Sequence, residues 1–423
     1  MTEPHAALEG ECGTRSAGPG TGRIGRTTAV SVAATVVVAI PVMLVGALSV
    51  LIREDIPFGE ARLGLGVSVH FLVAGVASII GGRAAERFRP RSTVRVGLAV
   101  SIVSLLVTAL IASTWWHVVV ALGLAGLATG VVHPAVNLVL AREIRPGLQG
   151  VLFGAKQAAV PAAALLAGFA VPAMASLGWR WAFALMALAA SCLIVVVPKW
   201  EYRRVVMTDA ADGLAPIPTG LVLLAGAGGA LASGSANAMS IFLVLFVTSI
   251  GLSLDFAAGF LILGSVSAIL SRLGAGLLAG RLVRGHFLLV GCMMTGGALG
   301  YMLLSVARSP VVLAVGVVIG FAAGWGWPGV MLLGVVRASP SAPATASGIT
   351  QGATFFGAVA GPAAFGGIAS SMSYDAAWRS MSIAAVVGAT LLLAASRMSH
   401  RPGRARDIAH GGVDPDSGHK GAA

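Results

Sequence analysis

Long apolar segments separated by short polar ones run through most of the chain, which has 423 residues. A helix needs about 20 mainly apolar residues to cross the hydrocarbon core of a bilayer. Twelve segments approach or exceed that length, and none carries an acidic residue in its interior. Because a soluble core cannot bury twelve such segments, the pattern predicts an all-α integral membrane protein. We expect transmembrane helices over about 29–51, 63–82, 94–113, 116–140, 148–174, 180–198, 218–249, 256–279, 286–307, 310–336, 344–370 and 376–396.

The second six segments repeat the first six. Gly-Leu-Ala-Thr-Gly-Val-Val-His-Pro at 126–134 aligns with Gly-Phe-Ala-Ala-Gly-Trp-Gly-Trp-Pro at 320–328. Two six-helix halves in parallel repeat predict a pseudo-twofold axis along the membrane normal, with a binding site between the halves near the bilayer midplane. The same offset pairs Gly154 with Gly348, Gln157 with Gln351 and Arg87 with Arg281.

The composition agrees with a surface that mostly faces lipid. Hydrophobic residues make up 57% of the chain and charged residues 10%, whereas soluble domains carry about 25% charged residues. The net charge of +12 does not indicate a nucleic-acid partner, because the basic residues form no patch interleaved with aromatic residues. Cys12, Cys192 and Cys292 have no metal-ligand spacing, and we expect neither a metal nor a cofactor.

Lysine and arginine residues concentrate in alternate loops. Positively charged loops stay on the cytoplasmic side, so this asymmetry predicts a multi-pass protein of the cytoplasmic (inner) membrane with both termini inside. The polar stretch 199–217 is the expected cytoplasmic linker between the halves. The prediction divides the rest of the chain into six-helix bundles at 28–198 and 218–397 and disordered cytoplasmic tails at 1–27 and 398–423.

The segment Gly82-Arg-Ala-Ala-Glu-Arg-Phe-Arg-Pro-Arg91 follows the second expected helix. It resembles the loop signature of the major facilitator superfamily, usually written G-x-L-A-D-R-x-G-R-R, with Gly82, Glu86, Arg87 and Arg91 in matching roles. Glu stands where the family has Asp, and Arg-Pro replaces Gly-Arg. A weaker copy in the second half ends at Arg281 and lacks the acidic residue. The resemblance implies a conformational latch, in which a carboxylate and several arginines form charge pairs in one state only.

Together with the twelve helices, the linker and the repeat, this resemblance covers the chain apart from its tails. The chain is identified as a member of the superfamily, and residues 150–183 resemble the helix five to six region of bacterial members grouped near cyanate and carboxylate transporters. No Walker loop, zincin pair or GxSxG elbow is present, so we expect neither ATP-driven nor hydrolytic activity. We expect a monomer in the lipid bilayer with a small-molecule substrate.

Two cations fall inside the expected helices. Charged groups deep in a bilayer are costly and usually functional, and the helix interiors hold Lys156 and Arg272 but no carboxylate to neutralise them. We interpret Lys156, with its neighbour Gln157, as a contact for an anionic substrate. The alternative is that Lys156 extends to the cytoplasmic surface. For Arg272 we favour a structural or gating role.

Further side chains lie on helix faces that can point into a cavity between the halves. His133 and Asn137 are one helical turn apart beside a proline, and His133 is the candidate for proton coupling because histidine titrates near neutral pH. The alternative for His133 is a neutral ring hydrogen-bonded to a neighbouring helix. Plain packing and interhelical hydrogen bonding are the alternatives for the remaining substrate-binding candidates. These are Asn237, Trp325, Trp327, Gln351 and Phe355.

The leading hypothesis is a secondary transporter that moves a small organic or inorganic anion by alternating access. A co-transported proton would use His133. One alternative is a proton-coupled exporter of hydrophobic drugs, which the aromatic, glycine-rich second half would permit. A second alternative is a transporter-like sensor that binds a ligand without moving it.

Overall fold

The computed structural model describes residues 21–143, 146–200, 218–339 and 343–399, and most of them are helical. Eleven of the described helical segments are long and apolar enough to cross a membrane, and α7, with 17 residues, is a shorter apolar helix. The expected all-α fold with twelve transmembrane segments is therefore confirmed. The first half holds α1 (Thr21–Ala47), α2 (Ser49–Asp55), α3 (Glu60–Arg87), α4 (Pro90–Leu106) with the π-helical turn Val107–Ile111, α5 (Trp115–Glu143), α6 (Pro146–Leu177) and α7 (Arg180–Val196).

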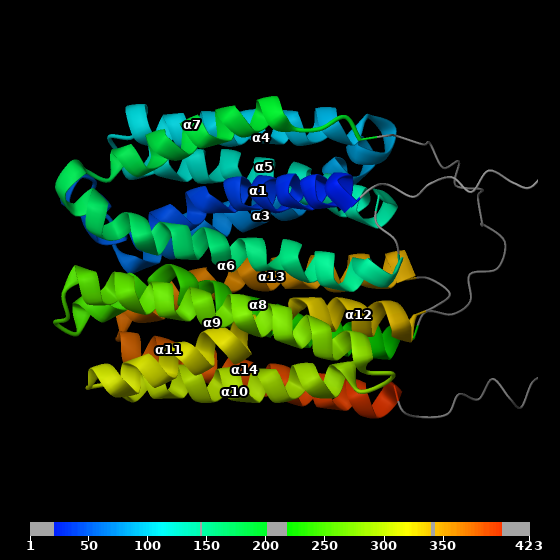
Figure 1. The fold of residues 1–423 in the computed structure, drawn as a ribbon. Coiled ribbons are helices and arrows are strands. Elements are labelled where there is room, and N and C mark those ends of the chain that lie inside the picture. The colour runs from blue at the N-terminus through cyan, green and yellow to red at the C-terminus, as the bar shows by residue number, and fades with distance from the viewer. Residues whose placement is uncertain (1–20, 144–145, 201–217, 340–342, 400–423) are drawn as a thin grey trace, which may run out of the picture.

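The second half repeats this order from α8 onward. The two halves lie side by side with their helices roughly parallel to one long direction (Figure 1). The helices of the second half are α8 (Thr219–Ser249), α9 (Leu254–Arg281), α10 (His286–Val306), α11 (Pro310–Trp325), α12 (Pro328–Ala338), α13 (Pro343–Ser371) and α14 (Tyr374–Ser399).

Two ends of the bundle can be distinguished. The start of α1 and the end of α14 lie at the same end, the right-hand one in Figure 1, where α7 also ends. We call this end the linker face. The opposite end, where α3 begins and α13 ends, is the far face.

Large apolar side chains cover much of the outer surface. Val195, Leu110 and Phe356 are 76%, 73% and 71% exposed. A soluble protein rarely leaves so many such residues uncovered, whereas lipid solvates them. The exposed apolar side chains therefore agree with a bundle embedded in a bilayer.

Glycines let helices approach closely inside each half, as is typical of membrane bundles. On α5, a Cβ added at Gly130 would lie 2.6 Å from the Ala77 Cβ of α3. In the second half, a Cβ at Gly297 of α10 would lie 2.7 Å from Gly324 Cα of α11. Both distances are too short for a real side chain, so the packing of each half depends on these small residues.

The halves meet closely at the far face. The Ser68 hydroxyl of α3 donates to the Val359 carbonyl of α13 at 2.6 Å, and the Tyr374 hydroxyl of α14 donates to the Glu60 carboxylate of α3 at 3.1 Å. Backbone also touches backbone there, because a Cβ added at Gly64 would overlap the carbonyl group of Pro362. The far face is therefore closed.

The halves separate toward the linker face. A Cβ added at Gly154 of α6, or at Gly348 or Gly352 of α13, would have nothing within 4 Å. Gln351, on the same stretch of α13, is exposed. The close contacts of α3 with α13 lie nearer the far face, and from them we infer that the space between the halves opens toward the linker face.

Several expected boundaries differ from the structure: α3 runs to Arg87, five residues past its expected end, and α14 ends at Ser399, inside the segment assigned to the C-terminal tail. α1 begins at Thr21, inside the segment assigned to the N-terminal tail. The expectation of one continuous helix over 310–336 is wrong, because α11 ends at Trp325 and α12 begins at Pro328. Proline has no backbone N–H to continue the helical hydrogen bonding, and this interruption lies at the cavity described next.

Candidate functional site

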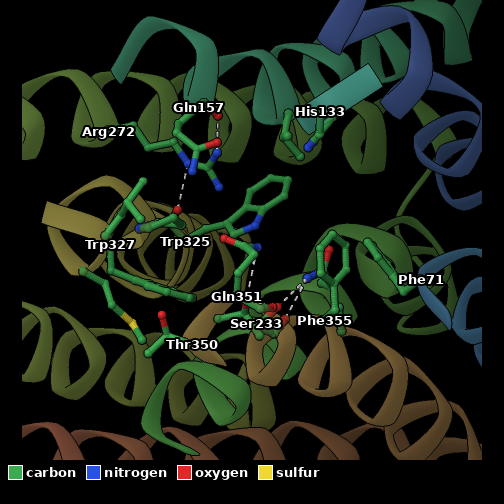
Figure 2. Close-up of a pocket in the computed structure, with 17 residues that line it drawn as sticks. Phe71, His133, Gln157, Ser233, Arg272, Trp325, Trp327, Thr350, Gln351 and Phe355 are labelled. Atoms are coloured by element: carbon green, nitrogen blue, oxygen red, sulfur yellow. Dashed lines mark hydrogen bonds between the residues drawn. The ribbon is translucent and has the colours of Figure 1, made fainter. Parts of the chain in front are cut away.

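A cavity lies between the halves, about midway along the helices. It holds about 160 Å³ of space for the centres of water molecules. One water needs about 10–15 Å³ by this measure, so the cavity has room for a small metabolite. Figure 2 shows the side chains that point into it. The lining consists of Phe71, His133, Gln157 and Val160 from the first half, and of Ser233, Asn237, Arg272, Trp325, Trp327, Pro328, Met331, Leu332, Thr350, Gln351, Thr354, Phe355 and Ala358 from the second.

The helix interruption between α11 and α12 shapes one wall. Because Pro328 cannot donate a backbone hydrogen bond, the Gly324 carbonyl loses its usual partner four residues on. The Trp327 indole N–H donates to that carbonyl at 3.0 Å instead. The Trp325 carbonyl accepts from the Arg272 Nε at 2.9 Å. The backbone carbonyls at the break thus accept hydrogen bonds from side chains that also line the cavity.

Arg272 of α9 connects the two halves. Besides the Trp325 carbonyl, its guanidinium donates to the backbone carbonyl of Gln157 on α6. The guanidinium carbon lies 5.1 Å from the centre of the Trp325 ring, a distance typical of a cation–π contact. Arg272 is 6% exposed. The carbonyl oxygens and the aromatic ring carry no formal negative charge, so none of these groups neutralises the guanidinium.

Lys156 lies one residue before Gln157 and is 3% exposed. Its side chain is therefore buried and does not extend to an exposed surface. Its neighbour Gln157 accepts a hydrogen bond from Arg272 through its backbone carbonyl, but Lys156 is not among the residues that line the cavity. Among the described residues, Lys156 has no hydrogen-bond or ion-pair partner.

The carboxylates with described side chains all lie at or near helix ends. Their positions are Glu54, Asp55, Glu60, Asp255 and Asp375. The site between the halves therefore carries positive charge from both sides, Lys156 from the first half and Arg272 from the second, and no described carboxylate offsets it.

His133 of α5 lines the cavity. Its Nε2 atom is buried and has no hydrogen-bond partner in the part of the chain that the structure describes. A buried polar atom without a partner is costly, and a ligand or water in the cavity would remove that cost. Asn137, one turn further along α5, is exposed and lies outside the cavity lining.

Amide and hydroxyl groups form the polar part of the second-half wall. The Asn237 side-chain nitrogen donates to the Ser233 carbonyl at 2.8 Å, and the Gln351 side-chain nitrogen donates to the Thr354 hydroxyl at 3.1 Å. In both bonds the amide nitrogen is the donor. Gln157 and Gln351, which are related by the repeat, reach the same cavity from opposite halves (Figure 2).

The aromatic candidates also meet at this cavity. Trp325 and Trp327 are 3% and 4% exposed and line one wall, and Phe355 lines another. Phe71 of α3 and Met331 of α12 were not predicted. Apolar residues inside a membrane helix give no sequence signal that separates cavity lining from packing or lipid contact.

Among the described side chains, the loop signature does not form the expected latch in this state. Arg91 donates from Nε to the Val197 carbonyl at 3.1 Å, within the first half. Arg87 and Arg281 are exposed, and the side chain of Glu86 lies outside the described residues. Gly82 does not provide a close helix approach here, because a Cβ added to it would have nothing within 4 Å. The latch is not formed because the halves are separated at the linker face.

Among the described residues, no three His, Cys, Asp or Glu side chains gather where they could hold a metal ion. A sequence-family model described as Major Facilitator Superfamily matches residues 30–362. No curated protein matches the chain. Among solved structures, the chain resembles one described as the crystal structure of D-xylose-proton symporter, with a TM-score of 0.76 and 15% sequence identity over 87% of this chain and 97% of that one. At this identity the likeness establishes the fold.

Proposed function

The chain belongs to the major facilitator superfamily, and from that premise we propose that this secondary transporter moves a small anion through the cavity between its halves. The observation that carries the proposal is the buried positive charge. Arg272 and Lys156 are 6% and 3% exposed, and the described carboxylates lie at helix ends. Burying charge without a counter-ion is costly, and an anionic substrate supplies the counter-ion each time it binds.

The aromatic and amide walls favour an organic anion. Trp325, Trp327 and Phe355 offer apolar surface beside Arg272, and Asn237 and Gln351 offer hydrogen bonds. A purely inorganic ion would leave the aromatic walls without a partner. A small carboxylate fits this mixture, because arginine binds carboxylates through two parallel hydrogen bonds.

The separation of the halves supports alternating access. In the described state the far face is closed by the contacts of Ser68 and Tyr374, and the cavity opens toward the linker face. We propose that the linker face is cytoplasmic, because basic loops are retained on that side. The structure then corresponds to the inward-facing state, and transport requires the far-face contacts to break while the linker face closes.

Proton coupling is part of the proposal through His133. Its unpartnered Nε2 atom borders the cavity that the Arg272 guanidinium also lines. An anion that binds beside these groups favours a proton on His133 by offsetting the nearby positive charge. Substrate and proton would then bind together, as symport requires.

The test is thermal stability of the purified protein against a panel of small anions and cationic drugs. A ligand at about 100 times its dissociation constant stabilises the folded state by about 2.7 kcal/mol. We expect a small carboxylate to stabilise the wild type and to lose most of that effect in Lys156→Gln. The matched control is Lys199→Gln, which removes an exposed lysine at the linker face and should respond as the wild type does.

Two results would favour the alternative functions. Stabilisation by cationic drugs alone, unchanged in Lys156→Gln, would replace the anion transporter with a drug exporter. Specific anion binding without counterflow in liposomes would indicate a sensor.

A further inference from the structure

A second cavity opens on the flank of the first half, at the far face between α3 and the start of α5. It is the roomier of the two, with about 620 Å³ of space for water centres against about 160 Å³ in the central cavity. It lies away from the space between the halves and plays no part in the proposed transport path. Its walls come from α3, from the first turns of α5, and from the short connections that precede these two helices.

The walls change from polar to apolar along the membrane normal. Arg62, Leu65 and Val69 line the cavity from α3, and their spacing places them on one helical face. Arg62 lies in the first turn, at the far face, and Val69 lies about 10 Å deeper at 1.5 Å per residue. Ser113 and Thr114 add hydroxyl groups just before α5 begins, and Val119 adds an apolar side chain deeper along it. A phospholipid has the same order, with its headgroup outermost.

Arg62 is available to a ligand. It is exposed and forms no hydrogen bond or ion pair with any other described residue. Of the nearby carboxylates, Glu60 accepts from Arg53 at 3.0 Å and Asp55 accepts from the Trp179 indole at 2.9 Å, while Glu54 is exposed and forms no ion pair with Arg62. A phosphate group would therefore be the natural counter-ion for Arg62.

The cavity wall is held in place by packing. A Cβ added at Gly66 would lie 2.8 Å from the Trp115 ring, so the glycine allows that ring to rest against α3. The Trp115 ring also stacks on Phe58, with 4.3 Å between the ring centres. Trp116, in contrast, is 74% exposed and lies where tryptophans border the headgroup region.

We propose that this groove is a binding site for an anionic phospholipid of the leaflet at the far face. The phosphate group lies against Arg62 and the hydroxyls of Ser113 and Thr114, and one acyl chain runs along Leu65 and Val69. The outward-facing apolar wall distinguishes this ligand from free phosphate, which has no use for it. Leu65 is 58% exposed and would be covered by the chain.

The experiment compares lipids on the delipidated, purified protein by native mass spectrometry. We expect phosphatidylglycerol to bind in preference to phosphatidylcholine of the same chain length. A basic residue near a membrane surface contributes roughly fivefold to anionic-lipid binding, so Arg62→Gln should remove a preference of about that size. The control Arg379→Gln removes another exposed far-face arginine, on α14, and should leave the preference unchanged.

A second variant separates the headgroup from the acyl chain. Val69→Trp fills the apolar part of the groove and keeps Arg62, so both lipids should lose the tightly bound copy. Wild-type preference in Arg62→Gln, or equal competition by inorganic phosphate and by glycerophosphate without acyl chains, would overturn the proposal. The readout does not involve the central cavity, so the lipid proposal can fail without any consequence for the proposed anion transport.

Discussion

Replacing Gly64 by alanine should shift the transporter away from the state seen here. Gly64 lies on α3 at the closed far face, where an added Cβ would overlap the Pro362 carbonyl oxygen and lie 3.2 Å from Ala363 Cα. Both neighbours are backbone atoms of α13 and cannot move aside by changing a rotamer. The methyl group therefore acts as a wedge between the two halves.

The size of the shift follows from that overlap. Carbon atoms in good contact are about 3.5–4.0 Å apart, so α3 and α13 must separate by roughly 1 Å to admit the methyl group. Overpacking of this kind costs about 1–3 kcal/mol, which changes a two-state equilibrium by about 5–150-fold. The cost falls on the state with the closed far face, because the helices part there when the far face opens.

Two distances measured by spin-label spectroscopy in liposomes would detect the change. One pair of labels at Ser176 and Asp255 reports the far face, and another at Arg83 and Ile349 reports the linker face; all four side chains are exposed. In a background without the native cysteines, Gly64→Ala should lengthen the first distance and shorten the second.

Two alanine variants serve as controls. Gly82→Ala lies on the same helix with nothing within 4 Å of the added Cβ, and it should leave both distances unchanged. Gly130→Ala clashes inside the first half, and it should lower stability without favouring either state. Unchanged distances in Gly64→Ala would refute the reasoning about the far-face contact.

Three further variants test other parts of the account. Tyr374→Phe removes the 3.1 Å hydrogen bond to Glu60 across the far face. A typical hydrogen bond contributes about 1 kcal/mol, so this variant should shift the two label distances in the same direction as Gly64→Ala but by less. A shift toward a tighter far face would contradict this. Gly357→Ala overlaps a backbone carbonyl of α8 and should lower the unfolding free energy by about 1–3 kcal/mol in a thermal melt, whereas an unchanged melting temperature would show that the close packing is absent. Gln351→Glu places a carboxylate in the cavity that Arg272 lines, so stabilisation by anions should be lost at neutral pH. It should return partly as the pH falls toward the ordinary glutamate pKa of about 4.3. Stabilisation by anions retained at neutral pH would argue against a shared anion site.

Much of the site could be predicted from the sequence because charge and polarity inside a membrane helix are rare. His133, Gln157, Asn237 and Gln351 stood out for that reason, and all four line the cavity. Arg272 also stood out, as a structural or gating residue, and the structure places it at the cavity with a hydrogen bond across the halves. The sequence does not show whether such a residue points toward the cavity, because that depends on how the neighbouring helices are placed.

Asn137 and the α11–α12 break show where local patterns fall short. Asn137 is one turn from His133 but is exposed and lies outside the cavity lining, so spacing along one helix does not decide which side chains reach the cavity. Pro134 and Pro328 are related by the repeat, yet α5 continues through Pro134 and the helix breaks before Pro328. The Trp327 indole satisfies the freed carbonyl at the break, and this tertiary contact has no signature in the spacing of prolines.

Counterflow in proteoliposomes is the most direct test of the central claim, that buried positive charge between the halves binds a transported anion. Vesicles loaded with the carboxylate found by the stability screen should transiently accumulate the labelled anion from outside. Arg272→Gln should abolish this accumulation, Arg272→Lys should retain part of it by keeping the charge, and Arg308→Gln, at an exposed far-face arginine, should leave it intact. Counterflow at the wild-type rate in Arg272→Gln, or anion binding without any counterflow in the wild type, would contradict the account.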